Sequence, residues 1–431
     1  MTGGFGGVAR PGEGSTRARP ASEPPKGDVS VAVAGPERAE PVRALRFKRS
    51  VPRFLAARAV GARVGAVAQA LAPLSFDELD PLPLPGAGWV RVRPLLAGIC
   101  GSDVATVHAR TSFYFGPIVS TPFVLGHEIV GVTEGRRVVI RPSLGCAVRG
   151  IEPPCRRCQA GDASCERVAF GHLAPGLQTG FCADTGGGWS TGLLAHESQL
   201  HDVPADLSDE AAVLIEPLAC AVRAVRTAAA APGDLCVILG AGAVGLLVFA
   251  ALRHLSGEPV RTVVVAKHAR QAAEARRLGA ETVVPPRTAA RHVRRLTRSD
   301  LLEPEYDAPY LSGGADVAFE CTGAAATLAD AMRLTRPRGT VVLAGMPAPD
   351  RLDLTPAWHR ELTIRGAYAA GPADVEAAFE IARTADLAPL VGPLFPLARW
   401  REAIDHAANA GRLGAIKVAF DVRDESKRES G

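Results

Sequence analysis

The sequence lacks any uninterrupted apolar run of about 18 residues, the length at which a membrane-spanning helix becomes a candidate. Lysine is scarce, with five residues among 49 cationic side chains, and a net charge of +4 over 431 residues predicts no basic face for nucleic acid. Residues 1–40 contain no apolar segment typical of a secretory signal. These absences predict a cytoplasmic protein with neither nucleic-acid nor membrane partners.

Cysteine is too sparse and too unevenly spaced for a disulfide framework. The chain has nine cysteines, an odd number, and three of them form a C-x2-C-x6-C run. This pattern favours a metal site or free thiols in a reducing compartment. A hydrophobic content of 47% with 22% charged residues is typical of a globular enzyme. The length of 431 residues predicts two or three domains.

Regular alternation of strands and helices is absent from the first half of the chain. Residues 1–41 form a Gly/Pro/charge tail that is predicted to be disordered. Short β-like runs separated by turns then fill residues 42–206. Over residues 207–368 apolar strands alternate with helices, which predicts a doubly wound parallel sheet and hence an α/β fold. Ser208 is placed to cap the first helix of this region.

A glycine-rich turn follows the first apolar strand of the alternating region and opens a helix. In such a turn the first glycine permits the bend, the second lets the backbone approach a pyrophosphate, and the third allows helix and strand to pack closely. Unpaired N–H groups at the helix start also attract phosphate. A purely structural turn is the alternative. The predicted dinucleotide-binding residues are Gly240, Gly242, Ala243, Val244 and Gly245.

An acidic residue is missing where an NAD enzyme normally binds the ribose hydroxyls. The second strand ends at Ala266, and Lys267, His268 and Arg270 follow it. These cations could bind the 2′-phosphate of NADP, whereas a carboxylate would repel it. The sequence therefore predicts that NADP is preferred over NAD. A solvated basic loop is the alternative.

Three short phrases contain residue types that ligate zinc. Cys100 lies in GICGSD, His127 and Glu128 lie in GHEIVG, and Glu216 lies in IEPLA. Thiolate, imidazole and carboxylate are zinc ligands, and a catalytic zinc site keeps one position open. Taken singly, each residue could be a core cysteine or a surface polar group. Together, the three phrases favour a catalytic metal site.

These phrases and the glycine turn resemble the zinc-dependent medium-chain dehydrogenase/reductase superfamily, in its sorbitol, threonine and glucose dehydrogenase branch. The resemblance covers about residues 42–420 and implies a GroES-like β catalytic domain followed by a Rossmann domain. It implies that the chain returns to the catalytic domain over residues 369–431, and that the protein is a homodimer or homotetramer. It further implies that zinc is held by the cysteine, the histidine and the glutamate of GHEIVG, with the glutamate of IEPLA as a direct or water-bridged fourth ligand.

A second cysteine cluster lies within 20 residues of the chain, at Cys146, Cys155, Cys158 and Cys165. The family's structural zinc lobe usually reads C-x2-C-x2-C-x7-C, whereas the spacings here are x8, x2 and x6. Glu152 stands at the usual place of the first ligand. Four thiolates this close can still complete a tetrahedral zinc site, because a loop can absorb an insertion. A zinc-free lobe with free thiols is the alternative.

The activity implied by the resemblance is hydride transfer between an alcohol or ketone and a nicotinamide cofactor. The substrate would be a small hydroxylated molecule, such as a polyol, a sugar or an amino alcohol, and zinc would stabilise its alkoxide. Ser102 stands where this family places the first hydroxyl of a proton relay, although it could instead cap a local turn. Ala105 replaces a histidine that related enzymes often have, so bulk water is the alternative for the outer end of the relay.

Two other functions remain as alternatives. One is a zinc-free quinone or enoyl reductase of the same superfamily, and the other is a non-catalytic dinucleotide-binding sensor. The complete cysteine, histidine and glutamate set counts against both. Two segments receive no function from the resemblance, namely the insertion Ser50–Pro73 and the polar, Gly-rich residues 171–191, which could bind a hydroxylated molecule. Within the insertion, residues 54–71 are interpreted as an amphipathic surface helix, with a membrane-binding helix as the alternative.

Overall fold

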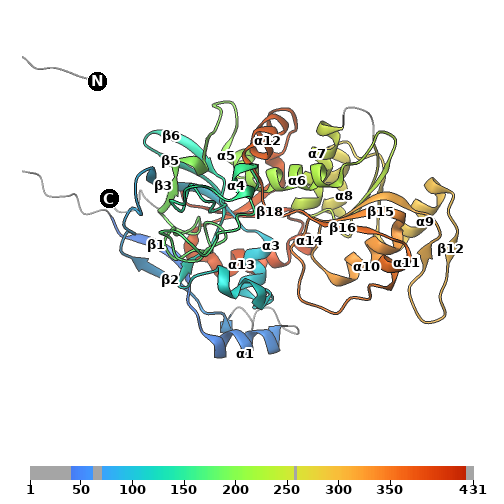
Figure 1. Cartoon of the computed structure of the whole chain (residues 1–431), viewed down its shortest axis with the longest axis horizontal. Coiled ribbons are helices and arrows are strands. Elements are labelled where there is room, and N and C mark those ends of the chain that lie inside the picture. Colours follow the sequence, from blue (N-terminus) through green and yellow to red (C-terminus); the bar gives the residue numbers. More distant parts are fainter. Residues whose placement is uncertain (1–39, 62–69, 257–259, 424–431) are drawn as a thin grey trace, which may run out of the picture. The chain divides into compact units, whose positions relative to one another are not determined.

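The computed structural model describes residues 40–61, 70–256 and 260–423, which are drawn in colour in Figure 1. Its compact body begins at Glu40. The tail predicted to be disordered therefore lies outside the described residues, apart from its last two positions. Among the described residues, no helix has the length and apolar content needed to cross a bilayer.

The smaller sheet of the β-rich region has the order β2-β1-β4. Its central strand β1 (Val42–Phe47) pairs antiparallel with β2 (Leu74–Leu79) and β4 (Phe123–Val124). The helix α1 (Val51–Gly61) lies between β1 and β2 in the sequence, inside the insertion Ser50–Pro73 (Figure 1). It begins three residues before the predicted surface helix; the later part of that prediction, residues 62–69, lies outside the described residues.

The larger sheet brings together segments that are far apart in the sequence. Its order is β17-β18-β3-β5-β6-β8, and β7 also pairs with β3. The strand β3 (Trp89–Gly98) ends just before Cys100, and β5 (Glu128–Thr133) begins at Glu128. The strand β18 (Lys417–Asp421) arrives from the end of the described chain and pairs antiparallel with β3. The other strands are β6 (Arg136–Ile140), β7 (Leu193–His196), β8 (Leu200–Asp202) and β17 (Val391–Phe395).

Short helices connect these strands. Four of them lie in the β-rich region: α3 (Gly101–Val107), η1 (Phe113–Ile118), α4 (Arg156–Gln159) and η2 (Glu197–Gln199). Near the end of the described chain lie η3 (Ala388–Leu390), η4 (Leu397–Arg399), α13 (Trp400–Ala408) and α14 (Ala410–Leu413).

The alternating region forms a parallel sheet with the order β11-β10-β9-β14-β15-β16. Side chains of β9 (Leu235–Leu239) point alternately into two hydrophobic cores. Cys236 and Ile238 pack in the core that α6 and α7 share, whereas Leu235 and Val237 pack in the core of α9 and α10. Helices therefore cover both faces of the sheet, and the predicted doubly wound α/β fold is confirmed.

The remaining bounds of this region are as follows. The strands are β10 (Arg261–Val265), β11 (Val283–Val284), β14 (Ala315–Glu320), β15 (Thr335–Leu343) and β16 (Thr363–Gly366), with a small hairpin of β12 (Leu301–Leu302) and β13 (Tyr310–Leu311). The helices are α7 (Ala243–Leu255), α8 (Ala269–Arg277), α9 (Pro286–Thr297), α10 (Ala325–Leu334), α11 (Thr355–His359) and α12 (Pro372–Thr384).

The helix predicted to follow Ser208 is divided into two, α5 (Asp209–Ala212) and α6 (Ile215–Ala228). Pro217 explains the division. Its ring nitrogen has no hydrogen to donate to a carbonyl four residues earlier, so proline is tolerated only in the first turn of a new helix. The Oγ of Ser208 accepts a hydrogen bond from the backbone N–H of Ala211 at 3.2 Å, so the predicted cap is present.

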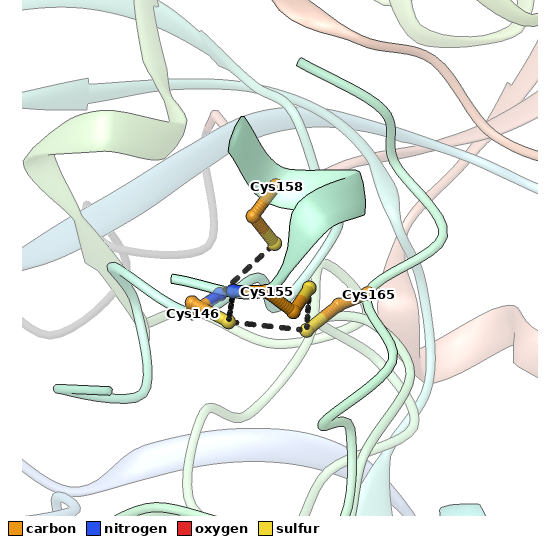
Figure 2. Close-up of side chains that lie close together, drawn as sticks. All are labelled: Cys146, Cys155, Cys158 and Cys165. Atoms are coloured by element: carbon orange, nitrogen blue, oxygen red, sulfur yellow. Dashed lines mark hydrogen bonds between the residues drawn. The ribbon is translucent and has the colours of Figure 1, made fainter. Parts of the chain in front are cut away.

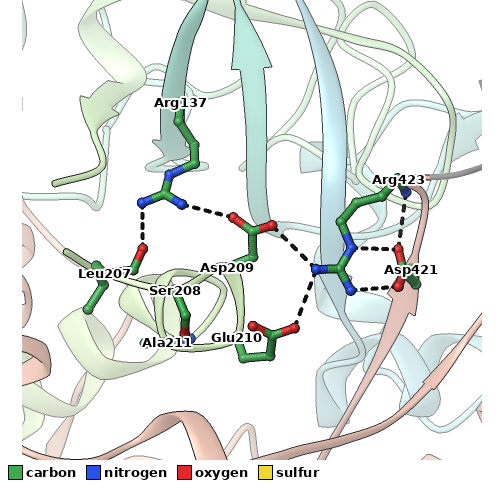
Figure 3. Close-up of polar contacts among 8 residues, drawn as sticks. All are labelled: Arg137, Leu207, Ser208, Asp209, Glu210, Ala211, Asp421 and Arg423. Carbon is green, nitrogen blue, oxygen red and sulfur yellow. Dashed lines mark hydrogen bonds and ion pairs between the residues drawn. The ribbon is translucent and has the colours of Figure 1, made fainter. Parts of the chain in front are cut away.

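Ion pairs fasten the start of α5 to the larger sheet (Figure 3). Arg137 of β6 lies 3.3 Å from Asp209, and Arg423, which follows β18, lies 3.4 Å from both Asp209 and Glu210. Arg423 also pairs with Asp421 at 2.6 Å. These contacts hold the helix pair that carries Glu216 against the sheet that carries the other predicted ligands.

Candidate active site and zinc sites

Three predicted ligands meet at the ends of neighbouring strands of the larger sheet. Donor atoms of Cys100, His127 and Glu128 lie within 4.8 Å of one another. Cys100 is the N-cap residue of α3, and His127 and Glu128 are buried. One thiolate, one imidazole and one carboxylate form a donor set that suits zinc and leaves a further coordination position open.

Asp103 belongs to the same cluster, although it was not predicted to. Its side chain is fully buried; Oδ1 lies 3.3 Å from Nδ1 of His127, and Oδ2 accepts the backbone N–H of Cys100 at 3.1 Å. The contact fixes the imidazole and leaves Nε2 for a metal. Burial alone would lower the pKa of His127, but the Asp103 carboxylate and the Cys100 thiol raise it well above the usual value. The cluster therefore favours positive charge, as a zinc site requires.

Lys417 of β18 is a second residue that was not predicted. Its Nζ lies 2.6 Å from both carboxylate oxygens of Glu128, and both side chains are at most 5% exposed. Burial would lower the pKa of Lys417, whereas the Glu128 carboxylate raises it. Gly98 makes room for the pair, since a Cβ there would lie 2.0 Å from Oε2 of Glu128. The sequence did contain one signal for this pair, namely a lysine within the apolar run AIKVAF at residues 415–420. Buried lysine is rare without a partner of opposite charge.

Glu216 lies in the first turn of α6 and is buried. It does not belong to the group of Cys100, His127 and Glu128, whose donor atoms lie within 4.8 Å of one another. Burial raises its pKa to about 7; nearby His127 lowers it and Glu128 raises it. The thiol of Cys220, one turn later, donates to Oε1 of Glu216 at 3.5 Å. Cys220 is thus a polar neighbour of the site. This placement favours the water-bridged over the direct arrangement implied for Glu216.

Ser102 is half-buried in the first turn of α3. Its carbonyl accepts the hydroxyl of Thr106 at 2.8 Å, and its own hydroxyl has no hydrogen-bond partner among the described residues. Both roles considered for Ser102, the first hydroxyl of a proton relay and the cap of a local turn, therefore stay predictions. His108 ends the same helix, and its Nδ1 lies 3.2 Å from the guanidinium of Arg110.

The four cysteines of the second cluster converge in the lobe around α4 (Figure 2). Their sulfur atoms all lie within 4.8 Å of one another, and Sγ of Cys165 is 3.7 Å from Cys146 and 4.0 Å from Cys155. Sulfurs bound to one zinc at 2.3 Å in a tetrahedron would be about 3.8 Å apart, so the set Cys146, Cys155, Cys158 and Cys165 fits a zinc ion. Backbone N–H groups point at three of these sulfurs, at 3.3–3.4 Å.

Residues 171–191 connect this lobe to the candidate active site. Buried Arg149 donates to backbone carbonyls of the lobe and of the segment, among them those of Leu144 and Leu173 at 3.1 and 3.3 Å. Further along, the ring of Phe181 lies 5.9 Å from the ring of His127. The amide oxygen of Gln178 accepts the hydroxyl of Tyr368 at 3.4 Å. The segment thus places side chains next to a predicted zinc ligand.

The glycine turn has the shape that a dinucleotide requires. Gly240 has a φ of +97°, which favours glycine, and a Cβ on Gly245 would lie 1.8 Å from the carbonyl oxygen of Gly240. Gly242 is the N-cap residue of α7, and a Cβ there would have no neighbour within 4 Å. Ala243 and Val244 form the first turn of the helix. The open space at a helix N-terminus fits a pyrophosphate.

The cations after β10 differ in their surroundings. Lys267 is exposed and has no ion pair among the described residues. His268 caps α8, with its backbone N–H donating to Gln271 at 3.3 Å. Arg270 already pairs with Glu274 at 2.9 Å. Of the three predicted phosphate ligands, Lys267 is therefore the best placed to accept a new anionic partner.

Comparison with known proteins places this architecture in a family. Residues 86–205 match the model described as "Alcohol dehydrogenase GroES-like domain", and residues 243–384 match "Zinc-binding dehydrogenase". The chain is 30% identical over 305 residues to "Probable D-xylulose reductase A" of Aspergillus clavatus, covering 66% of this chain and 76% of that protein. It is 29% identical over 367 residues to "L-idonate 5-dehydrogenase" of Vitis vinifera, covering 80% and 92%.

A solved structure has the same fold. The L-idonate 5-dehydrogenase of Escherichia coli superimposes with a TM-score of 0.63 at 22% identity, covering 88% of this chain and 98% of that one. The chain therefore belongs to the zinc-dependent medium-chain dehydrogenase/reductase superfamily, with a GroES-like domain and a Rossmann domain. The family predicted from the sequence is confirmed.

Proposed function

We propose that this protein is a zinc-dependent polyol dehydrogenase, which moves a hydride between a secondary alcohol and a nicotinamide cofactor. The observation that carries the proposal is the group of half-buried Cys100 and buried His127 and Glu128, whose donor atoms lie within 4.8 Å of one another, since a zinc-free reductase does not need it. The names of the relatives, which include a sorbitol dehydrogenase, support a substrate with several hydroxyl groups.

Zinc in this site would supply a Lewis acid that stabilises an alkoxide, and the nicotinamide would accept or donate the hydride. The protein residues prepare the site for that chemistry. Asp103 orients His127, and Lys417 balances the charge of Glu128. We propose that Glu216 acts on the metal through a water molecule, and that Ser102 passes the alcohol proton towards solvent. We also propose that residues 171–191 line the substrate site, since Phe181 lies beside His127.

The function is tested by assaying the zinc-loaded protein with a panel of polyols and with NAD or NADP. We expect reduced cofactor to form with at least one polyol, and chelation of zinc to abolish its formation. Quinone reduction that persists without zinc would instead identify a quinone reductase. If the zinc-loaded protein binds the cofactor but turns over no substrate, it is a non-catalytic dinucleotide-binding sensor.

The Glu216→Ala variant should impair turnover more than folding, because the carboxylate contributes charge near the metal rather than core volume. We expect kcat to fall by about tenfold or more, which corresponds to about 1.4 kcal/mol on the barrier. The melting temperature should stay close to that of the unmodified protein. Glu402→Ala is the matched control, since Glu402 also lies in the first turn of a helix. Unchanged turnover in Glu216→Ala would remove this residue from the site.

We propose that NADP is preferred over NAD by at least about tenfold in kcat/KM, the effect of one retained phosphate contact. Exposed Lys267 and the missing acid at Ala266 support this proposal. The Lys267→Ala variant should erode the preference and leave turnover with NAD nearly unchanged. Arg270→Ala should have a smaller effect, since Arg270 is already paired with Glu274. A wild-type preference for NAD would show that the basic loop faces solvent.

We further propose that the protein is a homodimer or homotetramer. The strand β16 ends the parallel sheet, and all four of its residues are exposed. An exposed sheet edge presents unpaired backbone groups that a second copy can pair with about a two-fold axis. Light scattering at micromolar concentration should therefore give at least the dimer mass, and a monomer mass would contradict the proposal.

A further inference from the structure

The fully buried side chain of Arg149 joins the cysteine lobe to residues 171–191, which we call the 171–191 segment. Its guanidinium donates to five backbone carbonyls, one in the lobe and four in or just before the segment: those of Leu144, Phe170, Leu173, Ala174 and Gly176. Gly171 makes room for this contact, because a Cβ there would lie 2.4 Å from the carbonyl oxygen of Arg149. One side chain therefore holds the first part of the segment against the lobe.

Arg149 belongs to the turn that carries the first cysteine of the lobe. Its backbone N–H donates to the carbonyl of Cys146 at 3.0 Å, and Cys146 lies against the other three cysteines (Figure 2). Within the described ranges, Arg149 has no carboxylate at ion-pair distance. Burial lowers the pKa of this arginine, while Cys182, Cys165, Asp184 and Cys146 raise it. Two of the groups that act on its charge are thus cysteines of the cluster.

A zinc ion in the lobe would leave the cluster of four cysteines anionic, since the charge of four thiolates exceeds that of zinc by two. Buried negative charge is costly unless donors or cations lie close to it. Backbone N–H groups meet three of the sulfurs, and Arg149 adds a full positive charge that its carbonyl partners cannot neutralise. The charge of Arg149 should therefore stabilise the lobe when zinc is bound.

Contacts within the segment continue from Arg149 to the candidate active site. Gly176, whose carbonyl accepts from Arg149, packs so closely on Cys182 that a Cβ on it would lie 2.5 Å from Cβ of Cys182. Phe181 directly precedes Cys182, and its ring lies 5.9 Å from the ring of His127. The residues that Arg149 holds are therefore packed against the turn that carries Phe181.

We propose that Arg149 couples zinc binding in the cysteine lobe to the position of the 171–191 segment at the substrate site. Its charge stabilises the thiolates, and its hydrogen bonds hold the segment where Phe181 lies beside His127. Without lobe zinc, the guanidinium loses its anionic neighbour and the turn from Cys146 loses its fixed end, so the segment loosens. The proposal rests on the proposed function only in taking this segment as a wall of the substrate site.

Hydrogen exchange in the Cys158→Ser variant, which should lack only the lobe ion, tests the coupling without changing Arg149. Amides of residues 170–184 should exchange at least about tenfold faster than in the zinc-loaded wild type, because they lose part of their protection against local opening. Amides of β9, in the parallel sheet, should exchange at the wild-type rate. Unchanged exchange in the segment after loss of the lobe zinc would overturn the proposal.

Two substitutions separate the charge of Arg149 from its hydrogen bonds. Arg149→Lys keeps the positive charge, but a single ammonium cannot reach five carbonyls. Zinc competition with a chelator should give a lobe affinity within about threefold of the wild type. Exchange in the segment should rise, and KM for the polyol oxidised in the panel assay should rise by at least about tenfold with kcat nearly unchanged. Arg149→Met should also weaken lobe zinc by about tenfold or more.

Arg360 provides the matched control, because it is also buried and donates to backbone carbonyls, while no cysteine acts on its charge. Arg360→Lys and Arg360→Met should lower stability and leave lobe zinc affinity and segment exchange unchanged. If the Arg149 variants behave in the same way, Arg149 is a purely structural residue and the proposal is wrong. The Cys158→Ser comparison decides the question if Arg149→Met does not fold. If the wild type oxidises no polyol, the proposed function fails, whereas exchange and zinc affinity still decide the coupling.

Discussion

The Lys417→Met variant is expected to lose about 3–5 kcal/mol of unfolding free energy, together with most of its dehydrogenase activity. The reason is the buried contact between the ammonium group of Lys417 and both oxygens of Glu128 at 2.6 Å. Removing one member of a buried ion pair leaves the other in a medium that solvates charge poorly, and Glu128 would then have only the zinc as a partner of opposite charge. The loss is measured by urea denaturation of the zinc-loaded protein, with turnover assayed in parallel.

Two comparisons separate this effect from a general sensitivity to losing a cation. Lys417→Arg keeps the positive charge and should be much less damaging. Arg338→Met removes the cation of an ion pair of similar length, 2.6 Å to Glu361, but that pair is exposed and the unfolding midpoint should hardly move. If Lys417→Met unfolds at the wild-type urea concentration, Glu128 is stabilised by some other group.

Replacing one cysteine in each cluster should remove a different zinc ion. The intact protein is expected to contain about two zinc ions per chain. Cys100→Ser should retain one ion and lose turnover by a factor on the order of 10³, because a Lewis acid contributes several kcal/mol to the transition state. Cys158→Ser should retain the other ion and melt roughly 10 °C lower, since zinc in a closed cysteine site contributes to folding.

Elemental analysis, melting curves and turnover of the two variants form one experiment. Cys236→Ser changes a buried cysteine of β9 that belongs to neither cluster, and it should keep both ions. No zinc in the wild type after expression with added metal would refute the mechanism. A wild type with a single zinc ion, which Cys100→Ser retains and Cys158→Ser loses, would leave only the structural site.

The fold and much of the candidate site could be predicted because their signals are local. The glycine turn lies between an apolar strand and a helix, so Gly240 and Gly245 indicated a Rossmann sheet before any contact was known. Cys100 and His127 are 27 positions apart, and only the resemblance indicated that they meet. The structure brings their donor atoms together, while their role as zinc ligands stays a prediction, as do the limits of the domains.

Other features could not be predicted because they depend on contacts between distant segments. Lys417 and Glu128 are 289 residues apart, and no local pattern reports their pairing. The division between α5 and α6 was missed although Pro217 is visible in the sequence, because the apolar spacing is continuous across it. Which side of α1 is exposed could not be predicted either, because it depends on the contacts of Phe54 and Arg58 with Phe113 of η1.

The position of Lys417 has a consequence for how the protein is made. Chains emerge from the ribosome N-terminus first, and Cys100, His127 and Glu128 all emerge at least 289 residues before Lys417, the separation of the ion pair along the chain. The strand β18, which carries the lysine, is also the antiparallel neighbour of β3 in the larger sheet. During most of synthesis the catalytic domain therefore lacks both an inner strand and the counter-charge of Glu128. A chain that stops before residue 417 would contain all the predicted zinc ligands and yet could not complete the site.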